Sequence, residues 1–204
     1  NGDGDFTFSR NSLKNRIAKN GYVTEVQQNI PSLSYKEISG VSDNCPHIAI
    51  EAQSTNLITY SENFSEWTSV GNAVVTDNFI KSPDGTKNGA KIVFDGTANA
   101  RIEIAVTSTG QITQSIYLKS EAETQDVSIG CVSTDLKVVT LTNQWQRFSH
   151  TSTSGSTPRV LCNDAATIYV AKAQAENSSF ASSYIKSNEG AASTRLTEGA
   201  FDSD

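Results

Sequence analysis

The chain has 204 residues and a formal net charge of -6, from 22 acidic and 16 basic side chains. The basic residues form no cluster, so the composition argues against a protein that binds the nucleic-acid backbone, which requires a clustered basic surface. No run approaches the roughly 18 apolar residues of a membrane span, and the first residues lack the apolar core of a signal peptide. We therefore expect no membrane insertion.

The composition favours a protein built from sheets. The apolar fraction is 36%, while Ser, Thr, Asn and Gly are abundant. Each strand of a two-layer sheet protein shows one face to water, so this balance is typical of an all-β sandwich, which commonly reaches this length as one unit. Because the chain contains no Met and starts at Asn1, we expect a mature or excised piece of a longer polypeptide.

Residues 1–46 are polar and carry only short apolar pairs. Asn20-Gly21 is a strong turn signal between Arg16-Ile17 and Tyr22-Val23, which predicts a small hairpin. The segment has too little apolar surface to offset its own ordering entropy. We therefore expect an N-terminal extended arm that packs on the main domain or on a neighbouring subunit.

The main domain opens with the stretch from Glu51 to Trp67. Its apolar run predicts a first strand, and residues 61–67 predict a loop or single turn that lays Phe64 and Trp67 back on the sheet. Short alternating segments follow, separated by turn signals such as Ser82-Pro83-Asp84-Gly85 and Asp95-Gly96. About nine or ten strands are expected, within residues 73–80, 90–94, 100–106, 111–120, 127–132, 137–141, 145–151, 159–162 and 167–175. We predict a sandwich over residues 47–186 and a C-terminal connector over residues 187–204.

Several motifs follow one another in a specific order along nearly the whole chain. They are Phe8-Ser9-Arg10-Asn11-Ser12 with Arg16, Asn20-Gly21, Asn29 to Tyr35, Cys45-Pro46 through Glu51, Thr55 to Glu62 with Phe64 and Trp67, Ser82 to Thr86 with Ala90-Lys91, Ser115 to Ser120, Trp145 to Phe148, Ala173 to Glu176, and Phe180 to Ile185. In this order they resemble a domain of bacteriophage tail and other virion proteins, itself similar to jelly-roll carbohydrate-binding modules. The resemblance implies an all-β jelly-roll sandwich on a tail fibre, tailspike or decoration protein of the virion. It also implies a homo-oligomer, for which a trimer is one option.

The resemblance further implies a structural calcium ion, because xylan- and cellulose-binding modules of similar sequence often hold one with the help of an acid on the last strand. Here that strand reads Ile168 to Ala173 and has no acid at its centre. No cofactor is therefore predicted, and the presence of a metal stays open.

Aromatic side chains are the candidates for ligand binding, since a ring face packs against the C–H face of a pyranose. Tyr117 alternates with Ile116 and Leu118, so it should face away from them, and it is the first candidate. Tyr60 and Tyr169 lie on similarly mixed segments. Trp67 is included as well, although its place at the end of the opening loop, like that of Trp145 at the start of a strand, is more typical of a core or corner residue.

The sequence contains no recognisable catalytic arrangement. Glu62 and Glu66 are close enough to suggest the paired carboxylates of a glycosidase, but ordinary loop acids are the simpler interpretation. No nucleophile elbow, zinc-protease motif or phosphate-binding glycine loop is present. Cys131 and Cys162 lie in strand-like runs, so we expect small buried side chains rather than a disulfide. The chain is predicted not to be an enzyme.

Two functions remain open. The first is a non-catalytic glycan-binding domain of a virion protein, which attaches to host surface polysaccharide. The second is a structural adaptor or decoration module that contacts other virion subunits and binds no sugar. The polar arm favours the second, because such arms commonly add edge strands to a neighbour.

Overall fold

A computed structural model describes residues 6–38, 41–187 and 189–202. The chain forms two compact units. The sandwich unit consists of residues 55–181 and 186–193. The terminal unit joins three separate segments, residues 1–54, 182–185 and 194–204. Within the described residues no helix has the length and apolar character needed to cross a membrane.

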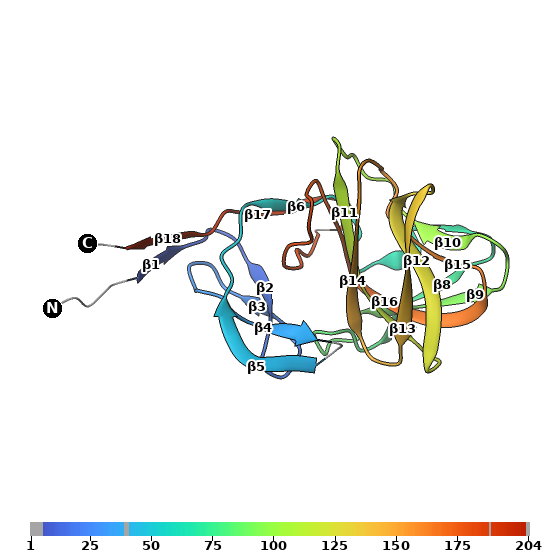
Figure 1. Ribbon diagram of the computed structural model, residues 1–204, viewed down its shortest axis with the longest axis horizontal. Coiled ribbons are helices and arrows are strands. Elements are labelled where there is room, and N and C mark those ends of the chain that lie inside the picture. Colours follow the sequence, from blue (N-terminus) through green and yellow to red (C-terminus); the bar gives the residue numbers. More distant parts are fainter. Residues whose placement is uncertain (1–5, 39–40, 188, 203–204) are drawn as a thin grey trace. The chain divides into compact units, whose positions relative to one another are not determined.

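The sandwich unit contains two five-stranded antiparallel sheets (Figure 1). In spatial order the first sheet consists of β13 (Asp135–Thr142), β12 (Thr124–Val132), β15 (Arg159–Cys162), β10 (Ala100–Glu103) and β7 (Thr68–Val70). The second consists of β14 (Gln146–Ser152), β11 (Ile112–Ser120), β16 (Ala165–Glu176), β9 (Gly89–Asp95) and β8 (Val74–Ile80). The chain crosses repeatedly between the two sheets, as in a jelly roll. The all-β jelly-roll prediction is confirmed, and so is its expected number of strands.

The space between the two sheets is filled by apolar side chains that alternate along each strand. In β11 these are Ile112, Ile116 and Leu118, and in β12 they include Val127 and Ile129, each at most 2% exposed. Burying one such side chain stabilises the fold by about 1.5 to 3 kcal/mol. The sandwich therefore depends on ordinary hydrophobic burial.

The opening loop closes one end of this core. The 3-10 turn η1 (Phe64–Glu66) brings the rings of Phe64 and Trp67 within 5.3 Å of each other, and both are buried. The expected corner is thus confirmed. Cys131 and Cys162 are also buried and form no disulfide, and burial raises the pKa of the Cys131 thiol to about 12.

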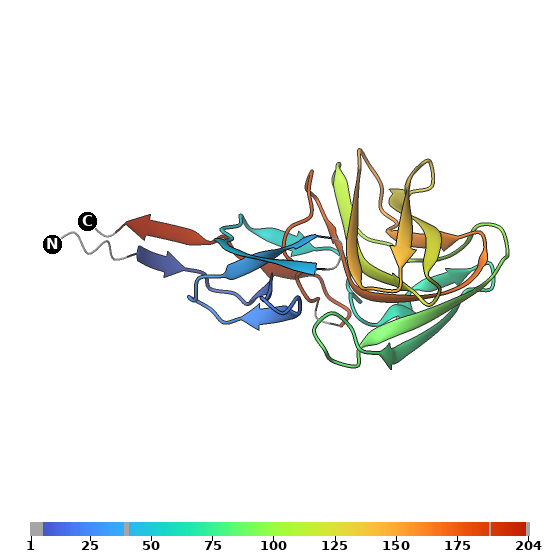
Figure 2. The ribbon, with the colours of Figure 1, turned by 60° about the horizontal axis from the view of Figure 1, so that its bottom comes forward.

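The terminal unit is made of two-stranded ribbons. β2 (Lys14–Ile17) pairs with β3 (Val23–Val26), β4 (Leu33–Ile38) with β5 (Val41–Ile48), and β1 (Phe6–Ser9) with β18 (Gly199–Asp202). Figure 2 shows β1 and β18 side by side, although they come from opposite ends of the sequence. Two short strands, β6 (Ser54–Asn56) and β17 (Ser193–Arg195), lie where the chain passes from one unit to the other.

The hairpin predicted at Asn20-Gly21 is confirmed by the β2–β3 pairing, and Gly21 has the positive φ of 80° that such a turn requires. The stretch predicted as a connector, residues 187–204, contains β17 and β18. Its final part therefore belongs to the same compact unit as the first 54 residues.

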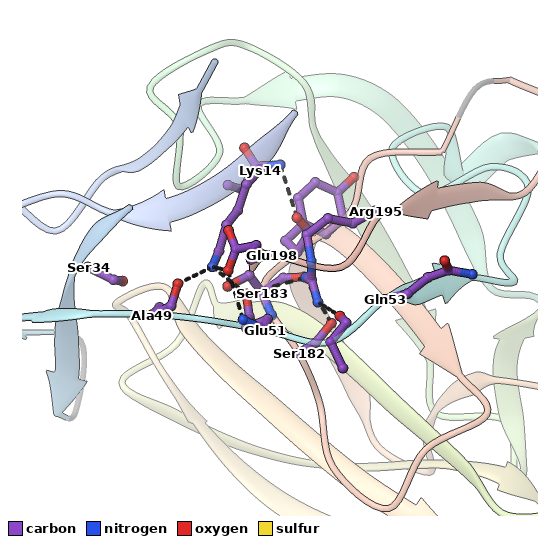
Figure 3. A network of polar contacts seen from close by, with 12 residues as sticks. Lys14, Ser34, Ala49, Glu51, Gln53, Ser182, Ser183, Arg195 and Glu198 are labelled. Atoms are coloured by element: carbon purple, nitrogen blue, oxygen red, sulfur yellow. Dashed lines mark hydrogen bonds and ion pairs between the residues drawn. The ribbon is translucent and has the colours of Figure 1, made fainter. Parts of the chain in front are cut away.

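Charged side chains occupy the interior of the terminal unit (Figure 3). The carboxylate of Glu198 binds Arg10 at 2.7 Å and Lys14 at 2.8 Å, and all three side chains are fully buried. Glu51 lies 2.9 Å from Lys14 and 3.4 Å from Arg195. Burial raises the pKa of Glu51, but Arg195 and Lys14 outweigh this and hold it at about 2. We call these five residues the buried charge network.

Candidate functional site

The site begins at an irregularity in β16, the longest strand of the sandwich unit. Ala171 pairs with Tyr117 of β11 and Gln174 with Ser115, so one extra residue is accommodated on β16 between these pairs. Lys172 sits at this bulge with a φ of 51°, a left-handed conformation that L-residues rarely adopt. Bulges of this kind re-aim a side chain, and here the one re-aimed is a lysine.

On its edge away from β11, the strand also changes partners at the bulge. Up to Val170 it pairs with β9, and beyond the bulge its backbone bonds to the opening stretch instead. Asn56 is fully buried there, with its amide donating to Ala173 O and its Oδ1 accepting from the Ala175 N–H. Ser61 O accepts from the Ala173 N–H at 2.9 Å. The opening stretch therefore places Glu62 next to Lys172.

Lys172 binds two carboxylates from two different loops. Its ammonium lies 3.0 Å from Glu62 Oε1 and 2.6 Å from Asp84 Oδ2, and its side chain is only 3% exposed. Asp84 belongs to the turn predicted at residues 82–85, which is confirmed by the bond from the Gly85 N–H to Ser82 O. The lysine thus ties the opening loop and this turn to β16.

Both carboxylates are held in the ionised form. Burial raises the pKa of Asp84, but hydrogen bonds from Lys172 and Thr86 outweigh it and lower that pKa well below its usual range. Burial likewise raises the pKa of Glu62, and the charges and hydrogen bonds of Lys172 and Lys186 turn the net shift downward. A glycosidase acid needs a raised pKa, so Glu62 has the opposite of the required property. Glu66 is exposed on η1.

A polar cleft of about 510 Å³ lies against Glu62. We call it the loop cleft. Its walls come from the opening loop, from β8 and the segment before β9, and from the segment after residue 185. The lining residues are Tyr60, Ser61, Glu62, Asn63, Ser65, Asp77, Asn78, Asn88, Lys186, Ser187 and Glu189.

Several of these side chains are fixed by hydrogen bonds. Asp77 accepts from the Phe64 and Ser65 N–H groups, each at 2.9 Å, and so holds the start of η1. Asn88 donates to Glu62 Oε2 at 3.1 Å, and Lys186 binds the same oxygen at 2.8 Å. These contacts give the cleft a set of hydrogen-bonding groups whose positions are defined before any ligand arrives.

One polar atom of the cleft is unsatisfied. Asn88 Oδ1 is buried and has no hydrogen-bond partner among the described residues. A buried acceptor without a partner costs about 1 to 3 kcal/mol. Tyr60 supplies the aromatic surface of the cleft, with its ring partly buried against the core.

The predicted ligand-binding residues lie in three places. Tyr60 lines the loop cleft. Trp67 is 3% exposed inside the core, where its indole N–H donates to Tyr60 O, as expected of a corner residue. Tyr117 and Tyr169 share the outer face of the second sheet, because Tyr117 pairs with Ala171 and Tyr169 with Lys119.

Both tyrosines of the outer face are buried, although their alternation with core residues suggests exposed rings. Tyr117 is 3% and Tyr169 7% exposed, because long neighbours cover them. The Arg147 guanidinium lies 5.9 Å from the Tyr117 ring centre, and Phe79 stacks on Tyr169 at 6.1 Å. Phe79, 43% exposed, is the most accessible of these three rings. Ligand binding by Tyr117, Tyr60, Trp67 and Tyr169 stays a prediction.

Sequence reasoning did not find Lys172, Asn88 or Lys186. The only signal in the sequence is a lysine in the middle of the largely apolar residues 168–175. For Asp84 the sequence predicts a place in a turn but no ion-pair partner. Within the described residues no group of three or more His, Cys, Asp and Glu side chains is arranged to hold a metal ion.

No family model matches the chain, and no curated protein matches it. Solved structures do match. The CBM22-1 xylan-binding domain of Paenibacillus barcinonensis Xyn10C is 13% identical, with a TM-score of 0.42 over 60% of this chain and 91% of that domain. A family 11 carbohydrate-binding module from Clostridium thermocellum, in complex with a β-1,3-1,4-mixed-linked tetrasaccharide, is 11% identical, with a TM-score of 0.41 over 62% of this chain and 96% of that module.

A third structure that matches is the enzymatically active domain of tailspike protein 4 from bacteriophage CBA120. It is 13% identical, with a TM-score of 0.42 over 59% of this chain. The aligned part spans only 21% of that domain. Identities this low concern the fold alone.

Proposed function

We propose that this protein binds a glycan without catalysis and that the loop cleft receives the sugar. The observation that carries this proposal is the composition of the cleft. It combines one aromatic ring, Tyr60, with hydroxyl, amide and carboxylate groups, of which Asn88 Oδ1 lacks a partner. Sites for small polar ligands have this form, since a ring receives the C–H face and fixed polar groups bind the hydroxyls.

The charges of the cleft favour a neutral sugar. Asp77 and Glu189 contribute negative charge, whereas Lys186, the one cation among the lining residues, is paired with the carboxylate of Glu62. A uronic acid or a sulfated sugar would bring its own negative charge close to these carboxylates. We therefore expect neutral glycans to bind more tightly than acidic ones, and we expect the difference to shrink at high salt.

We also propose a biological setting, which rests on the sequence resemblance. We place the protein on a bacteriophage virion, as part of a tail fibre, tailspike or decoration protein, with a host surface polysaccharide as its ligand. The order of motifs from Phe8 to Ile185 supports this assignment. Glycan binding without chemistry suits attachment, in which a particle must stay bound to an intact polysaccharide.

Calorimetric titration tests the site. The probes are a xylan oligosaccharide, a β-1,3-1,4-mixed-linked tetrasaccharide and polysaccharide released from bacterial envelopes. For a probe that binds, we expect Tyr60→Ala and Asn88→Ala each to weaken binding by about tenfold, the effect of roughly 1.4 kcal/mol. Asn143→Ala, in an exposed loop, should change nothing.

Phe79→Ala is the matched aromatic control. Its ring belongs to the outer face with Tyr117 and Tyr169 and does not line the cleft. Loss of binding in Phe79→Ala with unchanged binding in Tyr60→Ala would place the ligand on the outer face and overturn the proposed site. Absence of binding to every probe would contradict the glycan-binding function itself.

A second candidate function, assembly with other copies of the chain, is favoured by the surface of the terminal unit. Leu33 and Ile48 are direct partners in the β4–β5 ribbon and therefore share one face. They are 46% and 52% exposed. Further exposed apolar residues of this unit are Leu13, Tyr22, Ile30 and Ile50, between 47% and 52% exposed. Contact surfaces are marked by apolar side chains that gather in one exposed patch, and Leu33 with Ile48 is the pair that the strand register brings together here.

Solution mass separates the two candidates. If the ribbon mediates self-association, the double variant Leu33→Ser with Ile48→Ser should be a monomer under conditions in which the unaltered chain is an oligomer. Val138→Ser, which alters a 64% exposed side chain of the sandwich unit, is the control and should keep the original mass. An unaltered chain that is monomeric at all concentrations would contradict this second function and leave glycan binding untouched.

A further inference from the structure

The buried lysine of the sandwich unit bears on the calcium ion that the sequence resemblance implies. In the related modules an acid on the last strand helps to hold that ion. In this chain, Lys172 is the residue of the last sandwich strand that reaches the two loop carboxylates. The side chain that β16 places between these two carboxylates is thus a cation.

The residues present do not fit a calcium ion. Calcium takes about 6 to 8 oxygen ligands at roughly 2.3 to 2.6 Å. Between Glu62 and Asp84 lies the Lys172 ammonium, 3.0 and 2.6 Å from their oxygens and 3% exposed. It fills the space between the carboxylates and offers no oxygen. A divalent ion at this position would meet both steric exclusion and charge repulsion.

The other oxygens of the two acids are already committed. Asp84 Oδ1 accepts from the Ser82 hydroxyl and from the N–H and hydroxyl of Thr86. Glu62 Oε2 accepts from Asn88 and Lys186. The two negative charges are thus matched by the two ammonium groups of Lys172 and Lys186, and the group is neutral without a metal.

The backbone conformation at the bulge directs the Lys172 ammonium toward the two carboxylates. Lys172 occupies the bulge with a φ of 51°, a strained conformation for a residue other than glycine. Such a conformation persists only where the surroundings determine it. The two ion pairs join strand β16 to the opening loop and to the turn at residues 82–86, which lie 110 and 88 positions away from Lys172.

We propose that Lys172 is an internal cation that replaces a bound metal ion, so that the loops of this jelly roll close on β16 without calcium. Two consequences follow. The stability of the unaltered chain does not depend on divalent ions. Exchange of the ammonium for a carboxylate turns the same place into a calcium site, because three carboxylates then converge there.

Thermal unfolding in chelator and in millimolar calcium chloride tests both consequences. The unaltered chain should have the same Tm in both. Lys172→Asp should lose roughly 10 °C in chelator, because it leaves buried carboxylates uncompensated, and should recover part of this loss with calcium. Lys186→Met is the control, since that side chain is 65% exposed and also binds Glu62. Its Tm should change little and should not respond to calcium.

A charge-deletion set keeps the proposal testable if Lys172→Asp does not fold. Lys172→Met should be strongly destabilised, and adding Glu62→Gln and Asp84→Asn to it should restore much of the Tm, because no uncompensated charge is then left. Two results would overturn the proposal. One is a Tm of the unaltered chain that rises with calcium, and the other is a triple variant no more stable than Lys172→Met.

Discussion

The two units of this chain differ in the side chains that fill their interiors. The sandwich unit fills its interior with apolar side chains, and every member of its core cluster lies between Ile58 and Ala175. In the terminal unit, the buried apolar side chains among the described residues are few: Phe8, Val23, Val26, Tyr184 and Ile185. Charges occupy much of the remaining interior, where Arg10, Lys14, Arg195 and Glu198 are each at most 5% exposed.

The terminal unit shows that segments distant in sequence can be joined without a large apolar core. Hydrophobic burial is non-directional, so it specifies poorly which of several short ribbons should meet. An ion pair in a dry interior has a defined geometry, and a wrong partner leaves a charge uncompensated. We therefore expect the buried charge network to specify how the chain segments that carry its five residues are arranged.

The largest effect is expected from removing the central acid of the buried charge network. Glu198→Ala leaves Arg10 and Lys14 buried without their partner and should destabilise the terminal unit by about 3 to 5 kcal/mol. The loss of stability is measured by hydrogen exchange, with the amide protection of residues 6–54 compared with that of residues 55–181. Glu25→Ala, on the exposed surface of β3, should have almost no effect. Equal protection of residues 6–54 in both variants would show that the network is dispensable.

A core truncation is the matching change in the sandwich unit. Ile116→Ala removes a fully buried side chain and should cost about 2 to 5 kcal/mol, seen as faster exchange in residues 55–181. Val138→Ala, on an exposed side chain of the same unit, should cost less than about 0.5 kcal/mol. If both variants unfold at the same denaturant concentration, the sandwich does not depend on its core in the way described.

Acid should weaken the terminal unit through Glu51. Its pKa is lowered from 4.5 to about 2 in the folded chain, so its ionised form contributes stability above pH 4.5. That contribution is lost as the pH falls from 4.5 toward 2, because the unfolded chain takes up the proton more readily. The protection of residues 6–54, corrected for the pH dependence of intrinsic exchange, should therefore fall over this range, and Glu51→Gln should flatten the response. A response of equal slope in Glu51→Gln would assign it to another group.

The smallest expected effect, which is also the simplest to measure, is a difference in reactivity among the three cysteine thiols. Cys45 of β5 is exposed, whereas Cys131 and Cys162 are buried and have raised pKa values caused first by burial. A thiol reagent at neutral pH should therefore modify one cysteine rapidly in the native chain. The two others should react only when the sandwich unit opens, which makes them a probe of Ile116→Ala. Rapid reaction of all three in the native chain would contradict the burial of the core.

Sequence reasoning predicted the local features well. The turns at Asn20-Gly21 and Ser82 to Gly85 depend on residues within four positions of one another, so their chemistry can be read directly. The alternation of Ile112, Ile116 and Leu118 predicted which face of β11 packs into the core between the two sheets. The aromatic corner of Phe64 and Trp67 followed from a spacing of three residues. Each of these signals is contained in a short window of the chain.

The features that the sequence did not reveal are contacts between distant residues. Arg10 and Glu198 are 188 positions apart, and Lys172 and Asp84 are 88 apart. Each of these charges looks like an ordinary surface residue when only its neighbours in sequence are considered. The loop cleft was missed for the same reason, since its lining comes from segments between Tyr60 and Glu189.

The all-β sandwich, its turns, its core-facing strand faces and its aromatic corner could thus be predicted from the sequence, because periodicity and turn chemistry act over a few residues. The partners of the charged side chains are visible only in the folded chain. A bulge at one residue turns Lys172 toward two carboxylates, and the pairing of β1 with β18 joins the two ends of the chain in one unit. The energy of a charge depends on its burial and its partners, and both are properties of the folded chain.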